Sequence, residues 1–295
     1  MADVTRRAPQ DGWLARAPSG GLVVGGIASV QLGAALAVHM FPWVGPGGVV
    51  ALRMTTAALV LLAISPPRLR GRALRGLPLA AAFGLVLAGM TLSIYNALHR
   101  IPLGIAVSLE FVGPLAVAVG GSRRKVDFVW VGLAAAGILA LTRGGAGAVS
   151  GVGVLFALLA GCLWGCYILL SARVGRTFER GAGLTVALCM AALVTLPVGL
   201  ASAGTHLVEP RSLALGAGIG ILSSAIPFSF ELEALRRIAP SVFGVLMSLE
   251  PAMAALAGWV VLGQGLSGRA VLGIALVVAA SVGASLRARR PPTDI

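Results

Sequence analysis

The feature that most constrains this chain is a series of long apolar runs that are almost free of Asp, Glu, Lys and Arg. Each run is long enough to cross the hydrocarbon core of a bilayer as a helix. The runs are continuous rather than alternating, which favours helices over the strands of a barrel. Ten spans are predicted, at about 22–41, 48–65, 77–98, 103–121, 126–142, 152–172, 183–203, 212–230, 242–262 and 270–286.

Composition agrees with a membrane protein. The 295 residues are 58% hydrophobic and 11% charged, whereas soluble domains carry about 25% charged residues. The fold class expected is therefore all-α and polytopic. The first run is long for a signal peptide and is followed by no small-residue cleavage pattern, so we interpret it as an uncleaved span. Cys162, Cys166 and Cys189 lie in apolar runs without further ligands nearby, which favours packing roles over a metal site.

The basic residues predict the orientation. The net charge of +13 would suggest nucleic acid in a soluble chain, but here the basic residues occupy the gaps between apolar runs. With a cytoplasmic N-terminus, the inner segments hold 18 of the 23 Lys and Arg residues and the outer loops hold four. The outer four are Arg100, Arg143, Arg211 and Arg269. The positive-inside rule then places both termini in the cytoplasm.

An internal repeat relates the two halves. At a constant offset of 137, segment 97–120 matches segment 234–257 at seven of 24 positions, including Pro114 with Pro251. The match joins spans 3–4 to spans 8–9, so the repeat unit has five helices and the second unit enters the membrane from the opposite side. The expected organisation is a cytoplasmic tail 1–21, a first repeat 22–142, a linker 143–151, a second repeat 152–286 and a cytoplasmic tail 287–295.

Glu110 and Glu250 are the leading candidates for a transport site. Each lies mid-span after Ser-Leu and is followed by a proline, Pro114 or Pro251, which frees a backbone carbonyl and bends the helix. A carboxylate at the bilayer centre costs at least ~2.5 kcal/mol, so it faces a wet cavity or carries a proton. Proton or substrate binding is one interpretation, and a neutral glutamate hydrogen-bonded between helices is the structural alternative.

Four further polar residues lie within or at the ends of the early spans. Arg53 either snorkels outward or faces the cavity to attract a carboxylate. Gln31 has an amide with no reason to face lipid, so we expect it at the cavity. Tyr95 and Asn96 close the third span, where Tyr95 either lines the cavity or belongs to the aromatic belt.

Several other residues have a simpler structural explanation beside the functional one. Ser108 and Ser248 contact substrate or, as is usual for serines in spans, bond backbone and pack closely. Trp164 and Tyr167 are weaker candidates for the site. Glu231 and Glu233 end the eighth span, and an ion pair of Glu233 with the following arginines explains that helix end.

Enzyme signatures are missing from the sequence. There is no GxxxxGK[ST], no HExxH, no GxSxG and no acidic loop cluster to hold magnesium. We therefore expect a transporter that is not an enzyme and that uses no cofactor beyond the proton-motive force.

Four blocks together resemble the inner-membrane threonine/homoserine exporter family of the drug/metabolite transporter superfamily. They are ASVQLGAALAVHMFPWVGPGGVVALRM (28–54), IPLGIAVSLEFVGPLAVAV (101–119), RRKVDFVWVGLAAAG (123–137) and FGVLMSLEPAMAALAG (243–258). The similarity runs from about 20 to 287 and includes the SLEFxGP and SLEP motifs. It implies two EamA-type domains, with ten helices in two inverted five-helix repeats around a central cavity in the bacterial inner membrane.

The resemblance also implies a function. It is export of small neutral amino acids such as threonine and homoserine by proton antiport and alternating access, with Glu110 and Glu250 carried over as site residues. Because related members move purines, drugs or nucleotide sugars, export of another metabolite stays open. A lipid-intermediate translocator or a membrane scaffold also stays open, although a scaffold would not need two mid-span glutamates. The partners expected are a small-molecule substrate, protons and the lipid bilayer.

Overall fold

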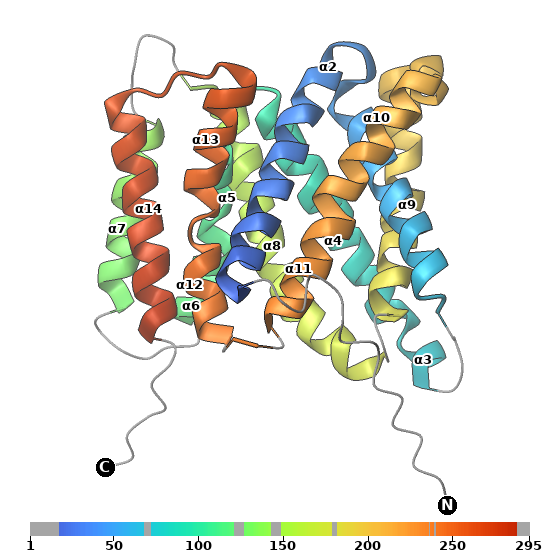
Figure 1. Cartoon of the computed structure of the whole chain (residues 1–295), viewed down its shortest axis with the longest axis horizontal. Helices are drawn as coiled ribbons and strands as arrows, with labels where there is room; N and C mark the ends of the chain where they lie inside the picture. The colour runs from blue at the N-terminus through green and yellow to red at the C-terminus, as the bar shows by residue number, and fades with distance from the viewer. Residues whose placement is uncertain are drawn as a thin grey trace, which may run out of the picture.

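The computed structural model describes residues 18–67, 72–120, 127–142, 149–178, 182–235, 237–238 and 240–287. All regular secondary structure in these residues is helical (Figure 1). The elements in chain order are α2 (Ser19–Ile64), α3 (Arg72–Arg75), α4 (Leu77–Leu98), α5 (Leu103–Glu110), α6 (Val112–Gly120), α7 (Asp127–Thr142), α8 (Gly151–Thr177), α9 (Ala182–Ala203), the 3₁₀ helix η1 (Gly204–Val208), α10 (Pro210–Gly220), the π-helix η2 (Ile221–Ala225), α11 (Ile226–Leu235), α12 (Pro240–Met247), α13 (Glu250–Leu262) and α14 (Gly268–Arg287).

Six helices among the described residues are long and apolar enough to cross a membrane: Ser19–Ile64, Leu77–Leu98, Gly151–Thr177, Ala182–Val208, Val242–Leu262 and Gly268–Leu286. Large apolar side chains such as Leu59, Leu155, Trp259 and Val260 are more than 60% exposed on the outside of the bundle. An apolar exterior of this kind suits lipid rather than water. The chain is therefore an all-helical, multi-pass membrane protein, as its composition predicts.

The first long helix, α2, consists of two arms that meet at a kink at Gly45. Gly45 has a φ of 66°, a left-handed conformation that glycine adopts without a Cβ penalty. Pro42 and Pro46 flank the kink and weaken the helical ladder there. The chain consequently turns back at the top of Figure 1, so that both arms of α2 run through the bundle.

Two pairs of short helices mark breaks inside apolar segments. α5 ends at Glu110 and α6 begins at Val112, while α12 ends at Met247 and α13 begins at Glu250. Pro114 and Pro251 follow these breaks and have no N–H to donate to a carbonyl four residues back. The sequence predicts a bend beside each glutamate, and the chain has a helix end at each.

The packing brings distant segments together. The arms of α2 pack against α9, α10 and α11, α4 packs against α8, and α14 packs against α7. α5 lies along α13, where Gly104 approaches so closely that a Cβ on it would lie 2.7 Å from the Ala255 Cα. The first residue of α2 and the last of α14 lie at the same end of the bundle, the lower end in Figure 1.

Candidate functional site

A cavity of about 490 Å³ lies inside the bundle. Residues of both arms of α2 and of α4, α5, α6, α8, α9, η2, α11, α12, α13 and α14 contribute to its wall. Most of the wall is apolar, with a few polar groups, a composition that is typical of small-molecule sites. The polar and aromatic lining residues are Gln31, Arg53, Thr91, Tyr95, Glu110, Phe111, Trp164, Tyr167, Ser223, Ser224, Glu231, Phe243, Glu250, Ser281 and Ser285.

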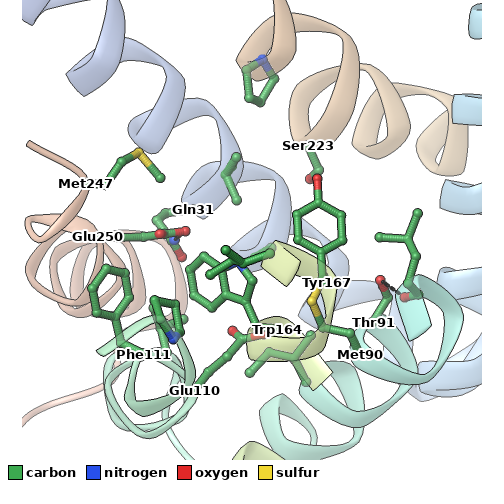
Figure 2. Close-up of a pocket in the computed structure, with 18 of the residues that line it drawn as sticks. Gln31, Met90, Thr91, Glu110, Phe111, Trp164, Tyr167, Ser223, Met247 and Glu250 are labelled. Atoms are coloured by element: carbon green, nitrogen blue, oxygen red, sulfur yellow. Dashed lines mark hydrogen bonds between the residues drawn. The ribbon is translucent and has the colours of Figure 1, made fainter. Parts of the chain in front are cut away.

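Glu250 is held by the first arm of α2. The Gln31 amide Nε2 donates to Glu250 Oε1 at 3.3 Å, and the two side chains lie together in Figure 2. The Gln31 amide oxygen Oε1 and the second Glu250 oxygen Oε2 are buried and have no hydrogen-bond partner in the described residues. Because an unpartnered buried oxygen is costly, this pair is prepared to accept a further donor such as a ligand, a water or a proton.

Glu110 points into the same cavity (Figure 2). Its carboxylate forms no hydrogen bond or ion pair with any described residue, although only 8% of the residue is exposed. The neighbouring Phe111 packs edge-on against Trp164, with ring centroids 5.3 Å apart. The Glu110 carboxylate therefore shares the cavity with these two rings and is available to a ligand.

The backbone beside Glu110 packs unusually closely on α8. A Cβ on Gly161 would lie 2.6 Å from the Glu110 carbonyl oxygen, and a Cβ on Gly113 would overlap the Gly161 carbonyl group. Two glycines thus allow α8 to approach the break between α5 and α6. This approach fixes where Glu110 enters the cavity.

Arg53 faces the cavity from the second arm of α2. Its Nη1 donates to Tyr95 Oη at 3.1 Å and its Nη2 donates to the Ser223 carbonyl at 3.2 Å. The remaining Nε is buried and has no partner in the described residues. Arg53 and Glu110 are close enough to attract one another electrostatically. Both Arg53 and Tyr95 therefore face the cavity, which is one of the two orientations expected for each from the sequence.

Three of the residues predicted for the site do not line the cavity. Asn96 donates to the Leu92 carbonyl of its own helix and accepts from Arg100. Ser108 donates to the Gly104 carbonyl at 2.6 Å. Ser248 donates to the Gly244 carbonyl and shares a 2.8 Å hydrogen bond with Ser281, which does line the cavity.

Glu231 lines the cavity, although its sequence position near two arginines predicts a helix-end ion pair. The expected ion pair forms between Glu233 and Arg237. Glu233 follows Glu231 by two residues and does not line the cavity. The spacing of Ser223, Pro227 and Glu231 places them on one helix face, and all three line the cavity. That four-residue spacing is the signal that could have identified Glu231.

The arrangement can bind a small zwitterion. A guanidinium and three carboxylates face one space, and two of their buried atoms, Arg53 Nε and Glu250 Oε2, have no hydrogen-bond partner in the described residues. Within the described parts of the chain, no group of three or more His, Cys, Asp or Glu residues is placed to hold a metal ion.

An internal cavity with a few polar groups in a bundle of apolar helices suits a membrane transporter, and comparison with known proteins identifies the family. Residues 151–286 match the model of the EamA-like transporter family. The chain is 44% identical over 270 residues to the threonine/homoserine exporter RhtA of Salmonella typhimurium strain SL1344, covering 90% of each chain. It is 43% identical over 268 residues to RhtA of Escherichia coli K12, again covering 90% of each.

The chain therefore belongs to the threonine/homoserine exporter family of the drug/metabolite transporter superfamily. It is a transporter and not an enzyme. A solved crystal structure has the same fold, with a TM-score of 0.57, 19% identity and coverage of 92% of this chain and 98% of that one.

Proposed function

We propose that this protein exports small neutral amino acids resembling threonine and homoserine from the cytoplasm. Its relatives are named as threonine/homoserine exporters, which supports this substrate class. The volume of about 490 Å³ also supports it, because a site of this size holds a small amino acid together with several waters.

The observation that carries the proposal is the unpartnered carboxylate of Glu110 in one cavity with the guanidinium of Arg53. A zwitterionic amino acid needs one anionic and one cationic contact. Arg53 offers donors to the substrate carboxylate, and Glu110 offers acceptors to the ammonium group. Gln31 and Glu250 complete the polar wall. Hydroxyl groups of Thr91 and Ser223 suit a short polar side chain.

We further propose that export is driven by proton antiport. A carboxyl group inside the membrane binds a proton or a cation most readily when no protein partner occupies it. Glu110 and Glu250 meet in one cavity, so substrate and protons compete for the same groups. Alternating access then opens this midplane site to one side of the membrane at a time.

The proposed architecture is ten spans in two inverted five-helix repeats, residues 22–142 and 152–286. The two arms of α2, the broken pairs α5–α6 and α12–α13, and the run from α10 through η2 to α11 each supply a span in this scheme. The distribution of basic residues supports cytoplasmic termini. A reporter fused at residue 72 should be cytoplasmic and one at residue 206 should be outside, and the opposite result would overturn the orientation.

The function is tested with inside-out vesicles that contain the protein and carry a proton gradient. We expect labelled threonine and homoserine to enter in a gradient-dependent manner, and a protonophore should abolish uptake. A panel of unlabelled purines, nucleotide sugars and other amino acids supplies competitors. If only a solute outside the neutral amino acids is transported, the proposed substrate class is wrong.

A further inference from the structure

Glu231 is the acidic side chain of the cavity for which the proposed binding scheme has no use. It lines the cavity wall from α11, and its carboxylate forms no hydrogen bond or ion pair with any described residue. Tyr167 and Glu250 line the same space. Because a partly buried carboxylate without a partner is costly, its presence calls for a ligand.

The depth of Glu231 differs from that of the other two glutamates. Glu231 lies four residues before the end of α11, which is about 6 Å from the lower end of that helix. Glu110 and Glu250 are separated from the same end of the bundle by α6 and by α12, each of which adds about 12 Å or more. Ser285, close to the lower end of α14, lines this part of the cavity as well.

We infer that Glu231 is a receiving site for the substrate ammonium group at the cytoplasmic end of the cavity. The inference rests on the proposed function, because it takes the lower end as cytoplasmic and the substrate as an amino acid. The substrate enters with its ammonium group drawn to Glu231. It then moves about one or two helical turns deeper, where Glu110 and Arg53 hold both of its charges. Glu231 thus determines how readily substrate is captured rather than how fast the loaded carrier turns over.

A matched pair of variants tests this role. Glu231→Gln removes a carboxylate that lines the cavity. Glu233→Gln removes a carboxylate of the same helix that pairs with Arg237 and does not line the cavity. In inside-out vesicles, Glu231→Gln should raise the KM for threonine about threefold to tenfold and leave the maximal rate within about twofold. Glu233→Gln should match wild type, and Glu231→Asp should recover part of the affinity.

Two kinetic results would overturn the inference. An unchanged KM in Glu231→Gln would mean that this carboxylate takes no part in capture. A reduced maximal rate at an unchanged KM would mean that Glu231 handles protons or conformational change instead.

A second measurement does not depend on which solute is transported. In a chain whose Cys162, Cys166 and Cys189 are replaced, Ser285→Cys reports on reagents that enter the cavity. A cationic trimethylammonium thiol reagent and an anionic sulfonate reagent are each added from the cytoplasmic side, and their rates of reaction at position 285 are compared. Adding Glu231→Gln should lower the ratio of the cationic rate to the anionic rate at least about threefold. Glu233→Gln should leave the ratio unchanged. An unchanged ratio in the Glu231 variant would refute attraction of cations by this residue, even if wild type transports neither threonine nor homoserine.

Discussion

Glu110 and Glu250 follow the same dipeptide, Ser-Leu, and each is next to a helix break, yet the two sites differ. Glu110 is the last residue of α5, whereas Glu250 is the first residue of α13. Their exposed fractions are nearly equal, 8% and 9%, so burial does not distinguish them. The difference lies in their partners: Glu250 accepts a hydrogen bond from Gln31, and Glu110 has no partner in the described residues.

Two similar sequence motifs in one chain therefore need not have the same role. The break at Glu110 is held from outside by the glycine contact with α8, and the carboxylate is left available. At the other break, the Glu250 side chain itself accepts a hydrogen bond from Gln31 inside the cavity. We therefore expect Glu110 to be the main contact for the transported ligand and Glu250 to organise the opposite wall.

The largest effect should follow from filling the glycine contact beside Glu110. Gly161→Ala would place a Cβ 2.6 Å from the Glu110 carbonyl oxygen, so α8 must move away from the break. We expect export to fall to a tenth or less and stability to fall by about 1–3 kcal/mol, measured by transport and thermal unfolding in detergent. Gly175→Ala on the same helix meets nothing within 4 Å and is the control. Equal behaviour of the two variants would show that the glycine contact does not position Glu110.

A smaller effect should follow from removing the partner of Glu250. Gln31→Ala leaves both oxygens of Glu250 without a donor in a buried place, and we expect a loss of about threefold to tenfold in transport rate. Asn96→Ala is the matched change, because that amide bonds its own helix and does not line the cavity. If Asn96→Ala impairs transport as much as Gln31→Ala does, then Asn96 belongs to the site, as its sequence position predicts.

The smallest effect should come from the two serines that precede the glutamates. Ser248→Ala loses the bond that joins the break between α12 and α13 to Ser281 of α14, which should cost about 1 kcal/mol of stability. Ser108→Ala loses only a bond to its own helix and should cost less. Transport by both variants should stay within about twofold of wild type. A large transport defect in either variant, with normal stability, would assign that serine to substrate binding.

The sequence predicts those parts of the site that local chemistry determines. A glutamate in an apolar span, with a proline nearby, is visible from residue types alone, and so is an arginine in a span. Contacts between distant segments are not visible in this way. Gln31 and Glu250 are 219 residues apart, and no periodicity joins them.

The cavity positions of Glu231 and Tyr95 could not be predicted from the sequence, because each residue has a second structural explanation that fits the same pattern. Glu231 and Glu233 both precede arginines, so an ion pair at the helix end accounts for either one. The four-residue spacing to Pro227 and Ser223, which also line the cavity, places Glu231 on the cavity face of its helix. For Tyr95, both the aromatic belt and the cavity satisfy the phenol, and the hydrogen bond from Arg53 decides between them.

The central claim, that Glu110 is the carboxylate presented to the ligand, is tested most directly by proton-gradient-driven uptake of labelled threonine into inside-out vesicles. Wild type, Glu110→Gln and Glu250→Gln are compared at matched amounts of inserted protein. We predict that the gradient-driven rate falls at least about tenfold in Glu110→Gln and falls less in Glu250→Gln. A Glu110→Gln variant that inserts normally and transports at the wild-type rate would contradict it.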